Sequence, residues 1–192
     1  MGDKKGEAIH ILDTVRVNGE LLHFFTSVIK IEGKIVDSSF VVFRGDFSPI
    51  KSEKYINTGP AGKIIVKTQY KGDKATINLS TPQGEKEIDI KLKDATYDNE
   101  EIVLLLPHLD FKGKEELKIN DLAALSGSIV KIKVKNLGED TVKVNDKAIA
   151  ANGYRLEFYG RKIDIYYSTD SKRMVLYRDE AQKLVMKLKP TE

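Results

Sequence analysis

The sequence predicts a mainly β-protein, an antiparallel meander of at least about ten strands with one or two short helices. The first observation is a period of two: Val130, Ile132 and Val134, for example, alternate with Lys131 and Lys133. Alternate side chains of a strand point to opposite faces, so each such segment has one apolar and one polar face. The second observation is that turn-forming residues separate these segments at short intervals, and short turns join neighbouring antiparallel strands.

The alternation recurs along the chain, and turn signals fall between its segments. The alternating segments are 64–70, 75–79, 88–92, 130–134, 154–158, 163–167 and 184–188, while 21–43 is strand-like with a turn at 32–34. The other predicted turns are 71–73, 82–84, 137–139, 144–146 and 159–161, and 121–127 can hold a helical turn. We expect a buried core that includes Ile77, Ile90, Leu104, Ile132, Leu156, Phe158 and Ile165.

One segment lacks this alternation and predicts a short, largely buried helix over residues 98–106. Asp98 can cap the helix N-terminus, and Glu100 and Glu101 suit the positive end of its dipole. Pro107 limits the length of the helix. An apolar run this short also fits a strand, so both alternatives stay open.

Composition and charge narrow the class of protein. The 192-residue chain is 41% hydrophobic and 32% charged, which is typical of a globular protein. Its net charge of +3 is spread over interspersed basic and acidic residues, so the sequence lacks the concentrated basic stripe that nucleic-acid binding requires. The absence of cysteine excludes disulfides and cysteine-based catalysis or metal sites, but it leaves the compartment open.

No Pro/Ser-rich linker and no shift in composition divides the chain, so we predict one all-β domain over residues 8–192. The preceding residues 1–7, Met-Gly-Asp-Lys-Lys-Gly-Glu, are expected to form a disordered tether. This start fits a cytosolic protein with a frayed end. It also fits a chain that follows a removed signal peptide, as in bacterial lipoproteins, and the family resemblance described below favours this second interpretation.

The motifs predict no catalytic, cofactor-binding or metal-binding residue. His10, His23 and His108 have no second histidine or carboxylate at metal-ligand spacing. No Gly-x-Ser-x-Gly motif occurs, and the Gly-Pro-Ala-Gly run at 59–62 lacks the ending of a phosphate-binding loop. Helix capping explains the acidic residues better than a calcium loop does; they are Asp94, Asp98, Glu100 and Glu101. We therefore predict a protein that is not an enzyme. An enzyme whose site is assembled from sequence-distant residues is the alternative.

Aromatic and basic residues gather in the last third of the chain. This mixture superficially resembles a stacking platform for single-stranded nucleic acid. Strands favour Tyr and Phe in any case, and acidic neighbours such as Glu157 and Asp164 neutralise the patch, so we predict no nucleic-acid partner. The residues concerned are Tyr154, Phe158, Tyr159, Tyr166, Tyr167 and Tyr177, with Arg155, Arg161, Lys162, Lys172, Arg173 and Arg178.

Four segments between Asp46 and Lys189 carry a family resemblance. Residues 97–109, Tyr-Asp-Asn-Glu-Glu-Ile-Val-Leu-Leu-Leu-Pro-His-Leu, match a short central helix, and the aromatic-Ser-x-Asp-x-x-Arg pattern within 164–178 matches a closing hairpin. The other two segments are 50–55, at the entry into a long meander, and 129–144, which matches paired strands. With these patterns the chain resembles the DUF3108 family of bacterial exported proteins and lipoproteins.

The resemblance implies a fold and a compartment, and it carries over no catalytic residue. The implied fold is a curved antiparallel sheet that forms an incomplete or closed β-barrel. The implied compartment is the cell envelope, periplasmic or extracellular, with membrane attachment only through an N-terminal lipid anchor upstream of this sequence; a cytoplasmic location is the alternative.

We accordingly expect a non-catalytic, envelope-associated binding or structural protein that holds a lipid-like or other apolar ligand or a protein partner. A plain protein-interaction module is a further alternative. If the sheet instead closes on itself, its own side chains, such as Phe40, Phe43 and Phe111, fill the interior.

Overall fold

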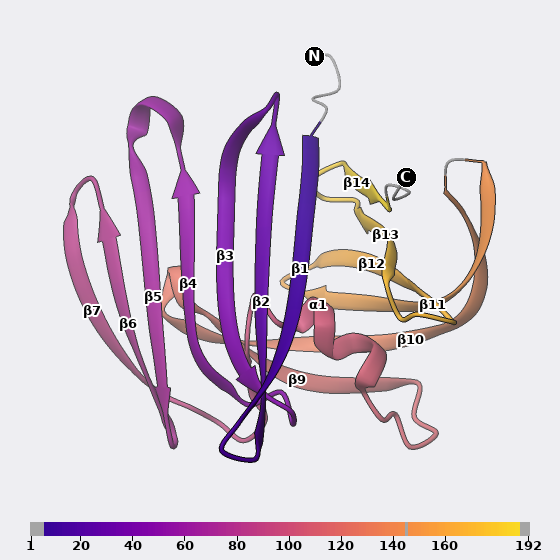
Figure 1. Ribbon diagram of the computed structural model, residues 1–192, viewed down its shortest axis with the longest axis horizontal. Coiled ribbons are helices and arrows are strands. Elements are labelled where there is room, and N and C mark those ends of the chain that lie inside the picture. The colour runs from indigo at the N-terminus through magenta and orange to yellow at the C-terminus, as the bar shows by residue number, and fades with distance from the viewer. Residues whose placement is uncertain (1–5, 145, 189–192) are drawn as a thin grey trace. The chain divides into compact units, whose positions relative to one another are not determined.

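The structure is a computed structural model that describes residues 6–144 and 146–188. Strands dominate this part of the chain, and they form two seven-stranded sheets with the orders β1-β2-β3-β4-β5-β6-β7 and β14-β13-β12-β11-β10-β9-β8 (Figure 1). The predicted β fold class is therefore confirmed. No helix in the described residues is long and apolar enough to cross a membrane.

Short turns join most of the strands, as the sequence predicts. The first sheet comprises β1 (Gly6–Val17), β2 (Glu20–Ile31), β3 (Lys34–Arg44), β4 (Pro49–Asn57), β5 (Lys63–Lys71), β6 (Lys74–Thr81) and β7 (Gly84–Lys91). The second comprises β8 (Thr96–Asp98), β9 (Glu116–Ala123), β10 (Ser128–Val144), β11 (Lys147–Phe158), β12 (Arg161–Ser168), β13 (Met174–Asp179) and β14 (Leu184–Lys187). The short helical elements are α1 (Ile102–Leu105) and the 3-10 turns η1 (Gly59–Ala61), η2 (Leu106–His108) and η3 (Ala124–Ser126).

Two features of the second sheet differ from the predicted meander. β8 runs parallel to β9, with Tyr97 opposite Asp121, because the chain between them contains α1 and η2 rather than a tight turn. The predicted turn at 137–139 is a β-bulge inside β10, which is one strand rather than the expected pair. Gly138 takes a left-handed φ of 79° there, and the register with β11 shifts between Asn136 and Gly138. The turn predicted at 144–146 includes residue 145, which lies outside the described residues.

The predicted helix exists, but it is shorter than 98–106. α1 begins at Ile102, after a turn that Asp98 caps, and Pro107 lies in the 3-10 turn that follows. The helical turn expected within 121–127 is η3. The tether expected over 1–7 falls mainly on residues 1–5, outside the described residues, and β1 begins at Gly6.

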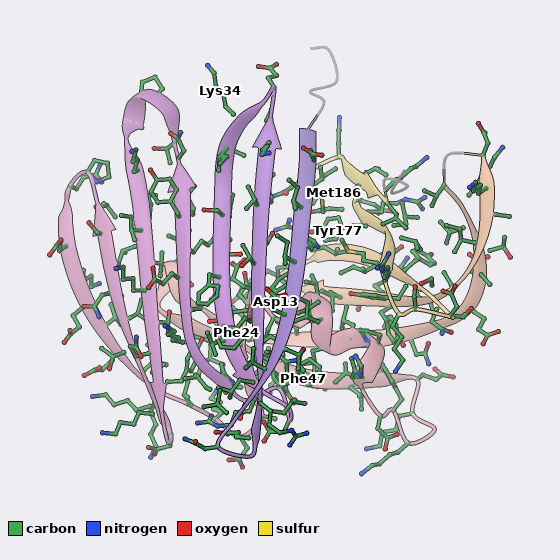
Figure 2. The ribbon with its side chains drawn as sticks, in the orientation of Figure 1. Asp13, Phe24, Lys34, Phe47, Tyr177 and Met186 are labelled. Carbon is green, nitrogen blue, oxygen red and sulfur yellow. The ribbon has the colours of Figure 1, made fainter. Side chains whose placement is uncertain are left out.

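The chain divides into two compact units. Unit 1 comprises Met1–Val103 and Asn120–Ile129, and unit 2 comprises Leu104–Ile119 and Val130–Glu192. In unit 1, an apolar cluster forms around Val66, Ala75, Ile77 and Leu122. In unit 2, Val142, Val144, Ala151, Val175 and Leu176 form a second cluster. At the end of the second sheet, Tyr177 on β13 is paired with Met186 on β14 (Figure 2).

The predicted core is correct at Ile77, Ile132, Leu156 and Ile165, which are all buried. It is wrong at three positions that are only half-buried, Ile90, Leu104 and Phe158. Ile90 lies on β7, which has a strand neighbour on one side only. Phe158 is the last residue of β11, beside an exposed turn.

The prediction for Leu104 fails for a different reason, its position around the helical segment. Helical spacing places Ile102, Leu105 and Leu106 on one side of the helical segment, and all three are buried. Leu104 does not share that side, so it remains half-buried.

Candidate functional site

Three buried carboxyl groups meet one tyrosine inside unit 1, and we call Asp98, Glu101, Asp121 and Tyr70 the carboxyl cluster. Asp98 ends β8, Glu101 precedes α1, Asp121 lies in β9 and Tyr70 lies in β5. The three acidic residues expose only 2%, 0% and 4% of their surfaces, respectively. Carboxyl groups are rarely buried to this extent without partners, so each one needs a physical account.

A reciprocal capping box holds Asp98 and Glu101 together. The backbone N–H of Asp98 donates to Glu101 Oε1 at 2.9 Å, and the backbone N–H of Glu100 donates to Asp98 Oδ1 at 3.0 Å. The hydroxyl of Tyr70 donates to Asp98 Oδ2 at 2.5 Å. Asp98 therefore caps the turn before α1 and not the N-terminus of α1, which begins at Ile102. This carboxylate accepts the hydrogen bonds that its charged form favours.

Burial is the main influence on the pKa values of the cluster. Desolvation, helped by the charge of Asp98, raises the pKa of Glu101 to about 9. Desolvation also raises the pKa of Asp121 to about 7, although a hydrogen bond from Asn99 opposes it. The pKa of Asp98 is raised by burial, while hydrogen bonds from Ser52 and Tyr70 act against that rise. At neutral pH Glu101 therefore carries a proton and Asp121 lies near the middle of its titration, whereas the hydrogen bonds to Asp98 favour its charged form against the desolvation that opposes it.

Two oxygen atoms of the cluster lack a hydrogen-bond partner in the described part of the chain, Glu101 Oε2 and Asp121 Oδ1. No group of three or more acidic, histidine or cysteine side chains there is arranged to hold a metal ion. Because the cluster is enclosed, a substrate cannot reach it without local opening.

Lys54 links the turn before α1 to the first sheet. Its Nζ lies 2.7 Å from Glu100 Oε1 and 3.3 Å from Asp37 Oδ2. Burial lowers the pKa of Lys54, but the charges of Glu100 and Asp37 outweigh this effect and hold it above its usual value. Burial also raises the pKa of Asp37. This part-buried bridge anchors the residues that carry the carboxyl cluster.

The structure separates the other groups that the sequence singled out. His10 lies edge-on to Phe25 with ring centroids 5.5 Å apart, and His23 stacks on Phe43 at 5.0 Å, so each packs against a different ring. His108 ends η2. The run at 59–62 is the 3-10 turn η1, as predicted.

Sequence reasoning found Asp98 and Glu101 but missed their partners Tyr70 and Asp121. A signal existed for Asp121, because it shares the inward parity of buried Ile119 in β9. An acidic residue at an inward strand position indicates a buried polar contact. Nothing in the sequence indicates that Asp121 accepts a hydrogen bond from Asn99, or that Asp98 accepts one from Tyr70 of β5.

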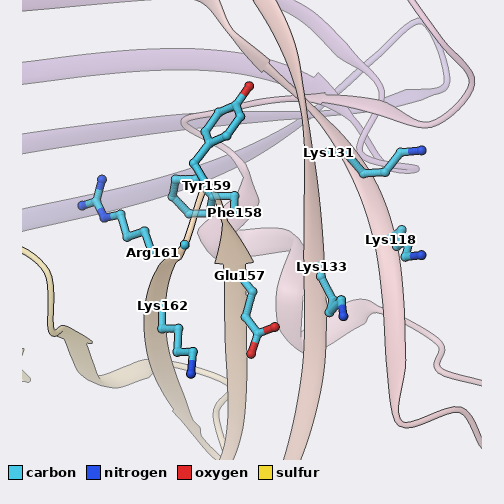
Figure 3. Close-up of a pocket in the computed structure, with 9 residues that line it drawn as sticks. Lys118, Lys131, Lys133, Glu157, Phe158, Tyr159, Arg161 and Lys162 are labelled. Carbon is cyan, nitrogen blue, oxygen red and sulfur yellow. The ribbon is translucent and has the colours of Figure 1, made fainter.

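A second candidate site is an open pocket of about 390 Å³ on unit 2, which we call the basic pocket (Figure 3). Its charged lining consists of five cationic side chains and one carboxylate. Register explains part of this arrangement, because Lys133 on β10 is opposite Glu157 on β11, and Glu157 is opposite Lys162 on β12. The lining residues are Lys118, Lys131, Lys133, Arg161, Lys162 and Glu157, with Phe158, Tyr159 and Gly160 at the hairpin turn.

Several of these charges are only partly neutralised. Lys133 pairs with Glu116 at 3.4 Å, Arg161 pairs with the buried carboxylate of Asp179, and Lys135 rather than a lining lysine pairs with Glu157. In residues 6–144 and 146–188, no ion pair within 4 Å involves the lining residues Lys118, Lys131 or Lys162. The pocket therefore presents surplus positive charge.

The aromatic residues of the last third do not form a platform. Tyr154 and Tyr167 are buried and meet edge-on, with ring centroids 5.8 Å apart. Arg155 is held by Asp164 through two hydrogen bonds of 2.6 and 2.8 Å. Tyr159 differs, since it exposes 85% of its surface at the turn between β11 and β12.

Known proteins resemble this chain in fold. The sequence matches no protein-family model and no curated protein. The structure is similar to a crystal structure described as a β-barrel-like protein of the domain of unknown function DUF1849 from Brucella abortus. The TM-score is 0.60 at 9% identity, and the match covers 95% of this chain and 84% of that chain. At this identity the likeness shows the fold alone, and membership of the DUF3108 family is not shown.

Proposed function

We propose that the protein is a non-catalytic binding or structural protein of the cell envelope. The observation that carries this proposal is the separation of its unusual chemistry from its accessible surface. The acidic groups Glu101 and Asp121, whose pKa values are raised, are enclosed, and neither lines the open pocket. An active site would place the perturbed groups in the cleft.

The enzyme alternative also draws on a specific observation. A carboxyl group that is protonated at neutral pH is the usual form of a general acid, and Glu101 fits that description. It lacks an accessible position next to a substrate. An enzyme of this kind would need the turn before α1 to open, and Lys54 and Tyr70 both hold that turn closed.

The surplus positive charge of the basic pocket favours an anionic ligand. Ser39, Ser52 and Thr68 are buried on the same face of the first sheet as Lys54, which makes the centre of that face partly polar. Phe43 in unit 1 and Phe111 in unit 2 are each buried, as expected where a sheet is covered by the protein's own side chains. Phe40 is half-buried. It is adjacent to the buried Val41 in β3, so the two side chains lie on opposite faces of the strand.

Support for the envelope comes from the DUF3108 resemblance of residues 97–109 and 164–178. Fractionation of the native host tests this part of the proposal. The protein should appear in periplasmic, membrane or extracellular fractions and not with a cytosolic marker. Recovery of the full-length protein with the cytosolic marker alone would overturn the envelope assignment.

The binding role needs a separate experiment. Native mass spectrometry of protein purified from its own host should show a retained ligand or a co-purifying protein. A substrate screen that finds turnover in the wild type, with loss of turnover in Glu101→Gln at unchanged stability, would instead establish the enzyme alternative. The surface variant Glu139→Gln is a suitable control because Glu139 is exposed in β10.

A further inference from the structure

We propose that the basic pocket and the Tyr159 hairpin form a docking face for an anionic membrane surface. This inference deepens the proposed envelope function and identifies one partner for it. It concerns only unit 2, on strands β9 to β12. The partner is recognised by its chemistry, a plane of lipid phosphates above an apolar layer.

Charge complementarity is the first support. Lys131 and Lys133 alternate with the buried residues Val130 and Ile132, so both lysines project from the solvent-facing side of β10. Lys118 on β9 extends to the same side as Lys131 (Figure 3). A lysine close to an anionic membrane gains about fivefold in partition, and Lys118, Lys131 and Lys162 have no ion pair to give up within the described residues.

The position of Tyr159 is the second support. Among the described residues it is the most exposed large hydrophobic side chain, at 85%, against 52% for Val185. It sits at the two-residue turn between β11 and β12 with a left-handed φ of 47°, a conformation that costs energy for any residue with a side chain. A tyrosine at such a tip suits the membrane interface, where its ring meets apolar chains and its hydroxyl meets headgroups.

The strand register places the two features together. Lys133 is opposite Glu157. Because the strands are antiparallel, Lys131 lies two residues closer than Lys133 to the turn that carries Tyr159. Lys162 follows that turn on β12. The exposed ring is therefore flanked by lysines on both sides, as an interfacial anchor requires.

A single-stranded nucleic acid is the competing polyanion, and the aromatic geometry argues against it. Base stacking needs a row of accessible rings, whereas Tyr154 and Tyr167 expose only 9% and 3% of their surfaces. One exposed tyrosine cannot form a stacking track. An open, lysine-lined face with one projecting aromatic residue fits a headgroup plane better.

The test is co-sedimentation of the purified chain with vesicles of phosphatidylcholine, with and without phosphatidylglycerol. Binding should require phosphatidylglycerol and should weaken steeply from low salt to about 1 M, where screening acts over roughly 3 Å. The variant Lys118→Gln/Lys131→Gln/Lys162→Gln should lose about a hundredfold in partition. Tyr159→Ser should weaken binding further, and Tyr159→Trp should preserve it.

The matched control is Lys71→Gln/Lys86→Gln/Lys91→Gln, which removes the same net charge from exposed positions on β5 and β7. It should bind like the wild type. The proposal would be overturned by an equal loss in both triple variants, by binding to vesicles of phosphatidylcholine alone, or by absence of binding. It would also be overturned if a single-stranded oligonucleotide displaced the bound protein at a lower concentration of negative charge than competing phosphatidylglycerol vesicles need. Because the assay uses purified protein, its outcome is independent of host fractionation, so failure of docking and failure of the envelope assignment are distinguishable.

Discussion

Tyr70 donates its phenolic hydrogen to Asp98 Oδ2 across 2.5 Å, which joins β5 of the first sheet to the turn that starts α1. The two residues are 28 positions apart in the chain, and both are largely enclosed. Burial together with the charge of Asp98 raises the pKa of Tyr70 above its usual value, so at neutral pH this hydroxyl keeps the hydrogen that it donates. This hydrogen bond therefore links β5 to the turn before α1.

Tyr70→Phe removes this donor while keeping the ring. We expect a loss of about 1.5–3 kcal/mol in the free energy of unfolding, because the acceptor is a buried carboxylate. Urea unfolding at neutral pH measures the loss. Tyr159→Phe is the control, since Tyr159 is 85% exposed, and it should change stability by less than about 0.5 kcal/mol. Equal effects of the two substitutions would contradict the buried hydrogen bond between Tyr70 and Asp98.

The phase of the helical segment gives a second prediction. Leu105 is 4% exposed, so Leu105→Ala should cost about 2–5 kcal/mol. Leu104 is half-buried, so Leu104→Ala should cost about 1 kcal/mol. The comparison uses the same chemical change at adjacent positions and is made by urea unfolding. A larger loss at Leu104 than at Leu105 would show that the helix is rotated from its described phase.

Much of the fold could be predicted because strand formation depends on patterns of neighbouring residues in the sequence. The period of two identifies β5, β6, β10, β11 and β12, and the tight turns at 71–73 and 159–161 lie where glycine permits a left-handed backbone. Gly138 shows the limit of this approach. A Leu-Gly-Glu sequence fits a turn and a bulge equally well, and only the pairing of β10 with β11 decides between them.

The candidate site could be predicted only in part, for a related reason. The capping box of Asp98 and Glu101 is local, with a spacing of three residues, so the sequence reveals it. The contacts of Tyr70 and Asp121 depend on how sequence-distant strands meet, which no local pattern encodes. The basic pocket likewise arises from register, because lysines that look evenly scattered along the chain fall on neighbouring strands.

A close approach in the second sheet makes Gly153 a sharp test of packing. A Cβ atom at this position would lie 2.8 Å from Cε1 of Tyr166 and 3.2 Å from Cβ of Leu137. Replacing a strand glycine by alanine normally stabilises, but here Gly153→Ala should cost about 1–3 kcal/mol, because a rigid ring must move.

A double-mutant cycle isolates this contact. In the Tyr166→Ala background the ring is absent, so Gly153→Ala should lose most of its penalty, and the interaction energy should exceed about 0.5 kcal/mol. Thermal or urea unfolding of the four proteins measures it. If the penalty is the same in both backgrounds, the ring of Tyr166 does not cover Gly153 in solution.

Protonation of the carboxyl cluster predicts an unusual dependence of stability on pH. The pKa of Glu101 is about 9 in the folded chain and has an ordinary value of 4.5, and the corresponding values for Asp121 are about 7 and 3.8. Between its ordinary and folded pKa, each group binds more protons in the folded state than in the unfolded state. Folding stability therefore falls as pH rises, by up to about 1.4 kcal/mol per pH unit for each group.

The direction follows from these raised pKa values. The stabilising contribution of Glu101 is fully present below about pH 4.5 and is lost progressively toward pH 9, and that of Asp121 is lost between about pH 4 and 7. Glu101→Gln keeps an acceptor for the Asp98 N–H and removes the titrating proton. The variant should therefore show a flatter stability curve from pH 5 to 9 and should be more stable than the wild type at pH 9.

Urea unfolding at a series of pH values between 5 and 9 measures both curves, and their difference isolates Glu101 from the remaining carboxyl groups. Glu139→Gln, at an exposed position, should run parallel to the wild type. Asp121→Asn should flatten the curve only up to about pH 7, because that is where the folded-state titration of Asp121 ends. A Glu101→Gln curve parallel to the wild type would mean that Glu101 is ionised in the folded protein. In that case its unpartnered Oε2 would have to be solvated, and the cluster would be open to water rather than enclosed.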